Sequence, residues 1–454
     1  MRVEDINISK FISHVGLVSL AFIASYAILE PAKGLLLIGI PFLVFFFIKP
    51  IFALIAFIFL IPFEASLIGI DDFISFFKIL GIVVAICYFV NKTVSMQFPS
   101  VGKIPHIKLM LIFLLLMFIS AIFSTDQTMS LIQYLTYVQL FFFYVIVIDF
   151  IDNERKFKYV ISALLLAGMI SAIYSIYNYY FESGTVFASD IRREAGFLEN
   201  ANRFGYLQTL IALLAFPHAM NIKNKIIRFI YIFAIAVLIF SSILSFSRGA
   251  VIALIATSLY VLTVLFKQKK IVIVLIAILA VIAILAPSTF WERTKTIIFP
   301  DEIEGSRQTR VAFLVDGFKM GLSAPVTGVG LGRFKEEFLK FSRRTVSPTA
   351  GGAHNMYVSI MAENGIPVLA AFLILLYRTL RKTRNYGRSS PRELTNYAIG
   401  IELGMVFTLC AGIFATIEYS KIFWLLLALA NVPDKIGCSL DSNMQLKTHQ
   451  RSLI

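Results

Sequence analysis

The pattern of apolar and polar positions is dominated by apolar runs that follow one another along almost the whole chain. Most approach the length of about 20 residues that a helix needs to cross a bilayer. A backbone inside the bilayer must satisfy its own hydrogen bonds, so the runs predict helices. There are 14 of them, at 14–29, 33–48, 51–63, 73–90, 107–124, 131–149, 158–181, 203–219, 225–244, 249–266, 271–286, 355–377, 395–414 and 418–432. We therefore expect an all-α polytopic membrane protein with about 12–14 transmembrane helices.

One long polar connection divides the chain. It covers residues 287–353, and within it residues 310–322 have helical spacing, APVTGVGLG reads as a Pro/Gly turn, and RFKEEFLKFSRR as a short amphipathic helix. Residues 1–286 are expected to hold the N-terminal transmembrane helices, with about 11 spans. Residues 354–432 should hold the C-terminal transmembrane helices, and residues 433–454 a cytoplasmic tail.

The distribution of charge between the connections indicates the orientation. Lysine and arginine gather in alternate short connections, at 91–106, 150–157, 220–225, 267–270 and 378–394. The connections on the other side include 64–72 and 125–130, which carry carboxylates. By the positive-inside rule, both termini are expected in the cytoplasm and residues 287–353 on the outer face, as one partly helical loop.

The composition fits this picture. Hydrophobic residues make up 58% of the 454 residues and charged residues 15%, while 41 basic and 27 acidic side chains give a net charge of +14. In a soluble protein this charge would suggest a nucleic acid partner. Here the basic residues lie in short loops between apolar runs, so membrane lipids are the expected partner and nucleic acid is not.

Arginines on the predicted outer side are the first chemical clue, because they run against the positive-inside bias. The guanidinium group is permanently charged and planar, and it matches phosphate oxygens through paired donors. Any one of these arginines could instead extend to lipid headgroups. Their gathering on one side favours an anionic ligand. They are Arg192, Arg193, Arg203, Arg248, Arg307, Arg310 and Arg333.

A His-Asn pair follows the long loop, in the stretch GGAHNMYVSIMAENG at residues 351–365. The unperturbed pKa of histidine is about 6.5, so His354 can accept a proton near neutral pH. It could equally be an interfacial histidine bound to a loop carbonyl. We expect Gly351 and Gly352 to allow a close backbone approach before the next helix. Asn355, Ser359 and Glu363 follow one another at helical spacing, so they form a polar stripe along that helix.

Glu363 is expected well inside the bilayer, where a carboxylate is costly. It is either a functional group or a structural hydrogen-bonding group to a neighbouring helix, and the residues alone leave both open. Glu402 in the next run is a potential neighbour. Pro367 removes the helical hydrogen bond to the Glu363 carbonyl, which predicts a kink there. The sequence contains no P-loop, zinc-type His/Glu pair or Asp-rich cluster, so neither a nucleotide cofactor nor a metal is expected.

Several of these stretches resemble the O-antigen ligase and O-antigen polymerase family of bacterial envelope glycosyltransferases. Arg310, then APVTGVGLGRF and AHNMYVSIMAENGIP, resembles the family's arginine, Pro-x-x-Gly-x-Gly and His-Asn motifs. REAGFLENANRFG at 193–205 and SRGA at 247–250 are also similar. The order and spacing of these stretches carry the resemblance, over residues 193–367. Leu314 departs from it, because many members have an aromatic residue there.

The resemblance implies an enzyme that transfers or polymerises a glycan carried on undecaprenyl diphosphate, without a metal or other cofactor. It implies that Arg193, Arg248 and Arg310 bind the diphosphate and that His354 activates the acceptor. The matched stretches add Asn202, Arg333, Asn355 and Glu363 as supporting residues. The acceptor would be another glycan or lipid A–core, and the active site would face the periplasm from the inner membrane.

A transporter or flippase for lipid-linked oligosaccharides is the main alternative, because it would also use outward basic residues and buried carboxylates. It would less readily explain a long, partly helical outer loop that ends in His-Asn, and it would more often show two-fold internal repeats. A non-catalytic scaffold explains neither the arginines nor His354. Between polymerase and ligase, the sequence slightly favours polymerase, because nothing in it points to a lipid A–core acceptor.

Overall fold

The computed structural model describes residues 43–64, 76–99, 102, 104–181, 193–198, 200–264, 286–298, 305–342, 352–389, 394–433 and 435–436, with single positions between 273 and 284. The chain divides into two compact units. One comprises Met1–Leu54 and Leu80–Phe98, and the other comprises Ile55–Ile79 and Pro99–Ile454. Every residue of the candidate site described below belongs to the second unit.

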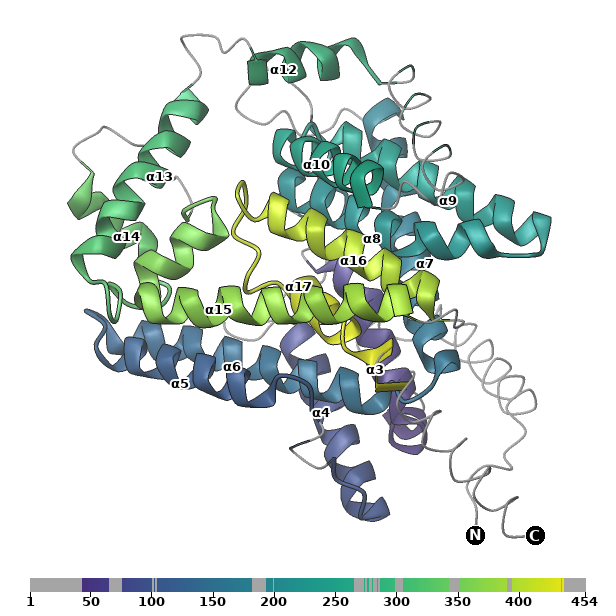
Figure 1. Ribbon diagram of the computed structural model, residues 1–454, viewed down its shortest axis with the longest axis horizontal. Coiled ribbons are helices and arrows are strands. Elements are labelled where there is room, and N and C mark those ends of the chain that lie inside the picture. Colours follow the sequence, from purple (N-terminus) through teal and green to yellow (C-terminus); the bar gives the residue numbers. More distant parts are fainter. Residues whose placement is uncertain are drawn as a thin grey trace, which may run out of the picture. The chain divides into compact units, whose positions relative to one another are not determined.

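The described residues form helices and no strand (Figure 1). Up to the long loop these are α3 (Pro50–Leu60), η2 (Ile61–Phe63), α4 (Phe76–Ser95), α5 (Ile107–Ile122), α6 (Gln127–Phe150), α7 (Glu154–Phe181), α8 (Ala201–Asn221), α9 (Lys225–Leu244) and α10 (Arg248–Val264). The later ones are α12 (Ser288–Ile298), α13 (Gly305–Ser323), α14 (Phe334–Phe341), α15 (Met356–Ser389), α16 (Thr395–Ala411) and α17 (Lys421–Leu429).

Among the described residues, five helices are long and apolar enough to cross a membrane. They are Phe77–Ser95, Gln127–Phe150, Glu154–Phe181, Lys225–Leu244 and Met356–Gly387. Shorter apolar helices occupy Pro50–Phe63, Ile107–Ile122, Arg248–Leu262 and Thr395–Ala411. The predicted class, an all-α polytopic membrane protein, is confirmed. The runs predicted at 14–29, 33–48 and 271–286 lie wholly or mostly outside the described residues, so the number of spans stays a prediction.

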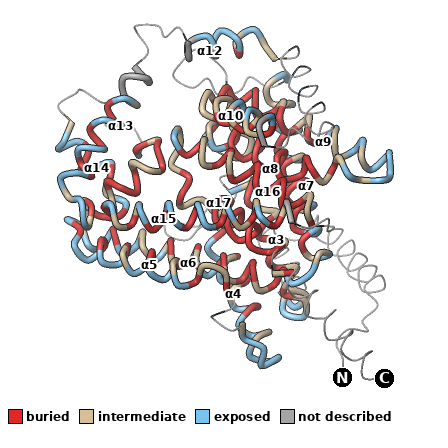
Figure 2. The backbone as a smooth tube through the Cα atoms, viewed as in Figure 1, coloured by how far each residue is buried: buried red, intermediate tan, exposed pale blue. Residues whose placement is uncertain are grey.

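Two helices with few exposed residues, α8 and α16, pack directly against each other. Figure 2 shows both as mostly buried. Gly400 and Gly404 on α16 make the approach possible. A Cβ atom on Gly400 would lie 2.4 Å from the Leu214 carbonyl oxygen, and one on Gly404 would lie 2.9 Å from the Leu210 side chain. Small residues four positions apart allow this close packing between membrane helices.

The predicted kink in α15 is present, and it lies at Gly365, two residues before Pro367. Gly365 has a φ of 83° and a ψ of 175°, which no α-helix contains. The break frees the Glu363 carbonyl from the helical ladder, because Pro367 has no N–H to donate. Two other groups bind that carbonyl instead: the Ser120 hydroxyl over 3.1 Å and the Gly330 N–H over 3.0 Å. The backbone of the Pro/Gly turn thus replaces the missing helical bond.

The Pro/Gly turn between α13 and α14 can adopt this position because of its glycines. Gly328, Gly330 and Gly332 have φ values of 68°, 119° and 74°. Residues with a Cβ rarely adopt such angles. The backbone also approaches its neighbours closely, since a Cβ on Gly330 would lie 2.0 Å from the Ser124 hydroxyl oxygen. The spacing of the Pro-x-x-Gly-x-Gly motif therefore reflects the backbone conformation of this turn.

The helices of the long loop pack on the first turns of α15. The helix predicted at 310–322 is part of α13, and the amphipathic helix after the turn is α14. Gly317 and Gly321 bring α13 close to α15, because a Cβ on Gly321 would lie 3.0 Å from the Met361 side chain. Phe313 of α13 lies in a buried apolar cluster with side chains of α14 and α15. The part of α15 before the kink is thus covered by the loop.

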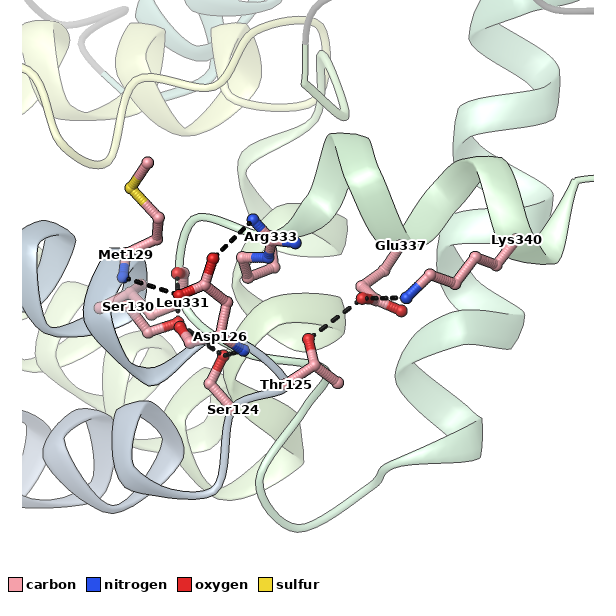
Figure 3. A network of polar contacts seen from close by, with 9 residues as sticks. All are labelled: Ser124, Thr125, Asp126, Met129, Ser130, Leu331, Arg333, Glu337 and Lys340. Carbon is pink, nitrogen blue, oxygen red and sulfur yellow. Dashed lines mark hydrogen bonds and ion pairs between the residues drawn. The ribbon is translucent and has the colours of Figure 1, made fainter.

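A polar network ties the end of the Pro/Gly turn to the connection between α5 and α6 (Figure 3). The Arg333 guanidinium lies 3.4 Å from the Asp126 carboxylate, which also caps the N-terminus of α6. The Ser130 hydroxyl donates to the Leu331 carbonyl over 2.9 Å. In Figure 3 this network continues to Glu337 on α14, which accepts from Thr125. The turn is therefore held on two sides, by α15 and by the α5–α6 connection.

Candidate functional site

His354 lies two residues before Met356, the first residue of α15, and its neighbour Asn355 fixes the start of that helix. The Asn355 Oδ1 accepts hydrogen bonds from the N–H groups of Tyr357 and Val358, both over 3.0 Å. This is an N-cap, which satisfies two donors that a helix start leaves without a partner. Asn355 is buried and points into its own helix. The Asn355 side chain therefore fixes the start of α15 directly after His354.

The backbone of His354 has a φ of 49°, in the left-handed region that residues with a Cβ seldom occupy. Its ring centroid lies 6.0 Å from that of Phe313 on α13. Burial lowers the pKa of His354, and the positive charges of Arg310 and Arg203 lower it further. Within the described ranges, no residue hydrogen-bonds the imidazole. His354 is thus a neutral imidazole at neutral pH, with two arginine charges within electrostatic range.

The Arg193 side chain joins the first turn of α8, which carries Asn202, to the turn between α9 and α10. The Arg193 Nε donates to the Ser245 carbonyl over 3.1 Å, and its Nη2 donates to the Asn202 Oδ1 over 2.8 Å. The same turn packs tightly on α8, because a Cβ on Gly205 would lie 2.3 Å from the Ser245 hydroxyl oxygen. Part of the Arg193 guanidinium is therefore used to hold the fold together.

Arg248 is the first residue of α10, immediately after this turn. The Ser247 side chain accepts a hydrogen bond from the Ala250 N–H over 3.4 Å and so caps the helix. Gly249 places α10 against the connection between α16 and α17, since a Cβ there would lie 2.8 Å from the Phe414 Cβ. The SRGA stretch therefore forms a capped helix start, in which Arg248 is followed directly by the glycine that packs on that connection.

The connection between α16 and α17, residues 412–420, is the part of the site that sequence reasoning missed. Its first carbonyl, of Gly412, accepts from the Met356 N–H over 2.7 Å at the start of α15. Near its end, the Tyr419 hydroxyl accepts from the Arg203 Nη2 over 3.0 Å. Between them, Phe414 meets Gly249 of α10. One short connection thus contacts the first turns of α8, α10 and α15.

Two predicted supporting residues, Glu363 and Arg333, contact the Pro/Gly turn or its end. Among the described residues, neither forms a hydrogen bond or ion pair with Arg193, Arg203 or Arg248. The Glu363 carboxylate accepts from the N–H groups of Gly332 over 3.0 Å and Phe334 over 3.2 Å. Arg333 forms the ion pair with Asp126 described above. The structure therefore supports the structural alternative for Glu363, in which the carboxylate clamps the turn against α15.

Two expectations about neighbours were wrong. Glu402 is not beside Glu363: it accepts from the Tyr260 hydroxyl and lies 3.9 Å from Arg384, near the far end of α15. At Gly352, a Cβ would meet nothing within 4 Å, so this glycine makes no close approach. The error at Glu402 arises because a linear pattern does not specify which turn of one helix faces which turn of the next. Gly351, Arg192 and the Arg307 side chain lie outside the described residues.

Among the described residues, His, Cys, Asp and Glu side chains form no group of three or more that could hold a metal ion. The charged groups that do gather near His354 are cationic. Phosphate oxygens are anionic acceptors, and arginine binds them through charge-assisted hydrogen bonds. The arrangement is thus suited to bind an anionic group close to a neutral imidazole.

These features define an all-α membrane protein in which Arg203 and Arg248 lie at the starts of α8 and α10, and His354 lies just before α15. Residues 232–373 match the family model described as O-antigen ligase. The match confirms the resemblance to the O-antigen ligase and polymerase family, and it supports a function of that general type. The matched segment includes Arg248, Arg310 and His354, whereas Arg193 and residues 412–420 lie outside it. No curated protein matches the chain.

Proposed function

We propose that the protein is a glycosyltransferase that transfers or polymerises glycans from an undecaprenyl diphosphate carrier at the outer face of the cytoplasmic membrane. The observation that carries the proposal is the position of His354 at the capped start of α15, where burial and the charges of Arg310 and Arg203 lower the pKa of its imidazole. It supplies a proton acceptor and a cationic surface within one site. An O-antigen ligase or polymerase needs both.

The reaction follows from these two groups. The acceptor hydroxyl loses its proton to a nitrogen of His354 as its oxygen attacks the anomeric carbon of the donor glycan. The bond between that carbon and the diphosphate breaks, and undecaprenyl diphosphate leaves with the electron pair. A single displacement of this kind inverts the anomeric configuration. Because burial and the two arginines keep the imidazole neutral, His354 is ready to accept the proton at neutral pH.

The leaving diphosphate gains negative charge in the transition state, and fixed cations stabilise that charge without reorganising. We assign this role to Arg248 and Arg310, with Arg193 completing the site from the turn that it holds. Arginine supplies two parallel donors to phosphate oxygens, so it positions the group as well as neutralising it. The charge stabilisation that this scheme needs comes from the chain's own residues, and we propose that the transfer proceeds without a metal.

We place the site on the periplasmic side, with both termini in the cytoplasm, on the distribution of basic residues between the connections. In this arrangement residues 1–286 and 354–432 cross the membrane, residues 287–353 lie outside it and residues 433–454 are cytoplasmic. α15 has 34 residues, more than the about 20 that a span requires. Its turns before Gly365 are therefore available to stand at the outer surface under α13 and α14.

The acceptor is a glycan hydroxyl, carried either on a second undecaprenyl diphosphate or on lipid A–core. We favour the first, a polymerase of O-antigen or exopolysaccharide repeats, because nothing in the sequence, and no feature of the site among the described residues, points to a lipid A–core acceptor. A flippase for the same lipids would bind the diphosphate too, but it would have no use for a neutral imidazole beside it.

The direct test supplies the purified full-length protein with an undecaprenyl diphosphate-linked repeat and analyses the products by mass spectrometry. Products longer by whole repeats, with release of undecaprenyl diphosphate, would support a polymerase, and transfer only to added lipid A–core would support a ligase. Movement of intact donor between leaflets of a vesicle without any product would contradict the proposal and support the flippase.

The proposed orientation has its own test. A cysteine tag in residues 320–340 should react from outside intact cells, while one at 385–390 should not.

A further inference from the structure

Arg203 lies in the first turn of α8, and the sequence singled it out only as one of several outward arginines. Asn200 caps this helix start, and its Oδ1 accepts from the Arg203 N–H over 3.2 Å. The Arg203 side chain is exposed. Its backbone is thus fixed while its guanidinium group faces away from the packed interior.

Tyr419 holds the guanidinium in place through two contacts. The Arg203 Nη2 donates to the Tyr419 hydroxyl over 3.0 Å, and the guanidinium carbon lies 5.7 Å from the centre of the tyrosine ring. A cation over an aromatic face is attracted by the ring quadrupole. Within the described part of the chain, the other N–H groups of this guanidinium make no hydrogen bond. The fork is therefore oriented in advance, and most of its donors are available to a ligand.

The connection that carries Tyr419 is itself anchored. The Glu418 side chain is buried, and the Glu418 carbonyl accepts from the Trp424 Nε1 over 2.8 Å. Trp424 is fully buried in α17. The backbone next to Tyr419 is therefore fixed by buried contacts, and so the position of the Arg203 guanidinium that binds Tyr419 is fixed as well.

Arg203 also lies within electrostatic range of the proposed base, because its charge contributes to lowering the pKa of His354. This separates it from Arg193, whose guanidinium binds Ser245 and Asn202, and from Arg333, which is paired with Asp126. Among the arginines of the site, Arg203 combines proximity to His354, exposure and a fixed orientation.

We propose that Arg203, oriented by Tyr419, is a further substrate-binding residue that donates paired hydrogen bonds to phosphate oxygens of the donor diphosphate. The proposal rests on the proposed function and deepens it, since it adds a ligand-binding residue from outside the segment that matches the O-antigen ligase family. Tyr419 is a positioning residue in this scheme and does not contact the substrate.

The test measures binding of undecaprenyl diphosphate to the purified full-length protein in detergent, by native mass spectrometry, without any acceptor. Loss of a charge-assisted hydrogen bond weakens binding by about 10- to 100-fold, which is the effect expected for Arg203→Ala. Tyr419→Phe keeps the ring and removes one neutral hydrogen bond, so a loss of about 2- to 10-fold is expected. Lys335→Ala removes an exposed positive charge from α14 and should leave the affinity unchanged.

The pH dependence of transfer separates a direct role from a structural one. Arg203→Ala removes a charge that lowers the pKa of His354, so the acid limb of kcat/KM should move to higher pH. Arg203→Lys keeps the charge but loses the fork. Its acid limb should stay near that of the wild type while its affinity for undecaprenyl diphosphate falls. If Arg203 had only a structural role, the Ala and Lys variants would not differ in this way: Lys would not keep the wild-type acid limb of kcat/KM while it loses affinity for undecaprenyl diphosphate.

The remaining outcomes would overturn the assignment. If Arg203→Ala raises KM for the acceptor and leaves undecaprenyl diphosphate binding intact, the phosphate that it recognises belongs to the acceptor. If phosphatidylglycerol binding falls equally, Arg203 contacts lipid headgroups in general. If Arg310→Ala abolishes binding while Arg203→Ala does not, this inference fails and the proposed function stands. A wild-type protein that neither binds the carrier nor transfers glycan would reject the proposed function itself.

Discussion

Gly328 lies against the backbone of Glu363 so closely that a Cβ on the glycine would stand 2.3 Å from the Glu363 carbonyl carbon. The contact joins the Pro/Gly turn to α15 at the turn just before the kink. Neither partner can move away easily, because the Gly330 N–H binds the same Glu363 carbonyl over 3.0 Å. The position of the long loop relative to α15, and with it that of α13 beside His354, depends on this contact.

Gly328→Ala should therefore destabilise the protein. The new methyl group would meet backbone atoms, which cannot rotate away, at a position where φ is 68°. Alanine at a positive φ costs more than about 1 kcal/mol even without a clash. The purified variant should unfold at a lower midpoint temperature than the wild type, and a transfer assay should show a reduced rate of glycan transfer. Gly352→Ala is the matched control, because a Cβ there meets nothing within 4 Å. Equal stability of the two variants would contradict the described packing of the turn.

Glu363→Gln tests whether the carboxylate acts as a clamp. Both of its oxygens accept backbone hydrogen bonds, from Gly332 and Phe334. Glutamine has only one acceptor oxygen, so one of these two N–H groups would face an NH₂ group and lose its partner, a loss of about 1–3 kcal/mol. The expected result is a lower unfolding midpoint, with transfer reduced only as far as the folded fraction is reduced. Loss of transfer by a variant of wild-type stability would instead assign Glu363 a part in the chemistry.

Much of the fold could be predicted from the sequence because it depends on local patterns. The apolar runs correspond to the helices from α5 to α10 and from α15 to α17, and the helix at 310–322 follows from its own periodicity. These predictions need only nearby residues. The resemblance to the O-antigen ligase and polymerase family, and not periodicity, placed Arg310 and His354 in one site, and the charge of Arg310 does lower the pKa of His354.

What could not be predicted depends on how distant segments are aligned. The clamp requires that Glu363 face Gly332, a relationship between one turn of α15 and one position of a glycine-rich turn. Tyr419 was hidden for a different reason. It falls within the apolar run 418–432, which reads as a membrane span, whereas α17 begins only at Lys421. Its contact with Arg203 joins residues more than 200 positions apart. Periodicity carries no information about either relationship.

Arg310 is expected to act both on the substrate and on the base. Arg310→Lys keeps the charge and loses the bidentate fork, so kcat/KM should fall by about tenfold or more, the worth of one charge-assisted hydrogen bond. Arg310→Ala also removes a charge that lowers the pKa of His354. That pKa should then rise, and the acid limb of the kcat/KM profile should move to higher pH. The unfolding midpoints of both variants serve as the control. An Arg310→Ala protein with wild-type kcat/KM would exclude Arg310 as a diphosphate ligand.

His354 decides whether the site is catalytic. It stands in a left-handed conformation before a capped helix, and within the described residues no group hydrogen-bonds its ring. If it is the base, His354→Ala should still bind undecaprenyl diphosphate and should unfold at the wild-type temperature. Its transfer rate should fall by about two to four orders of magnitude, the usual contribution of general base catalysis. A base with a lowered pKa is active above that pKa, so wild-type kcat/KM should decline only below about pH 6.5.

His354→Gln provides the sharper comparison, because glutamine keeps a hydrogen-bonding group of similar length but accepts no proton at neutral pH. It should be as inactive as His354→Ala and should show no acid limb. A His354→Gln protein that transfers glycan at nearly the wild-type rate would mean that His354 only positions the loop, and the base would have to be another residue.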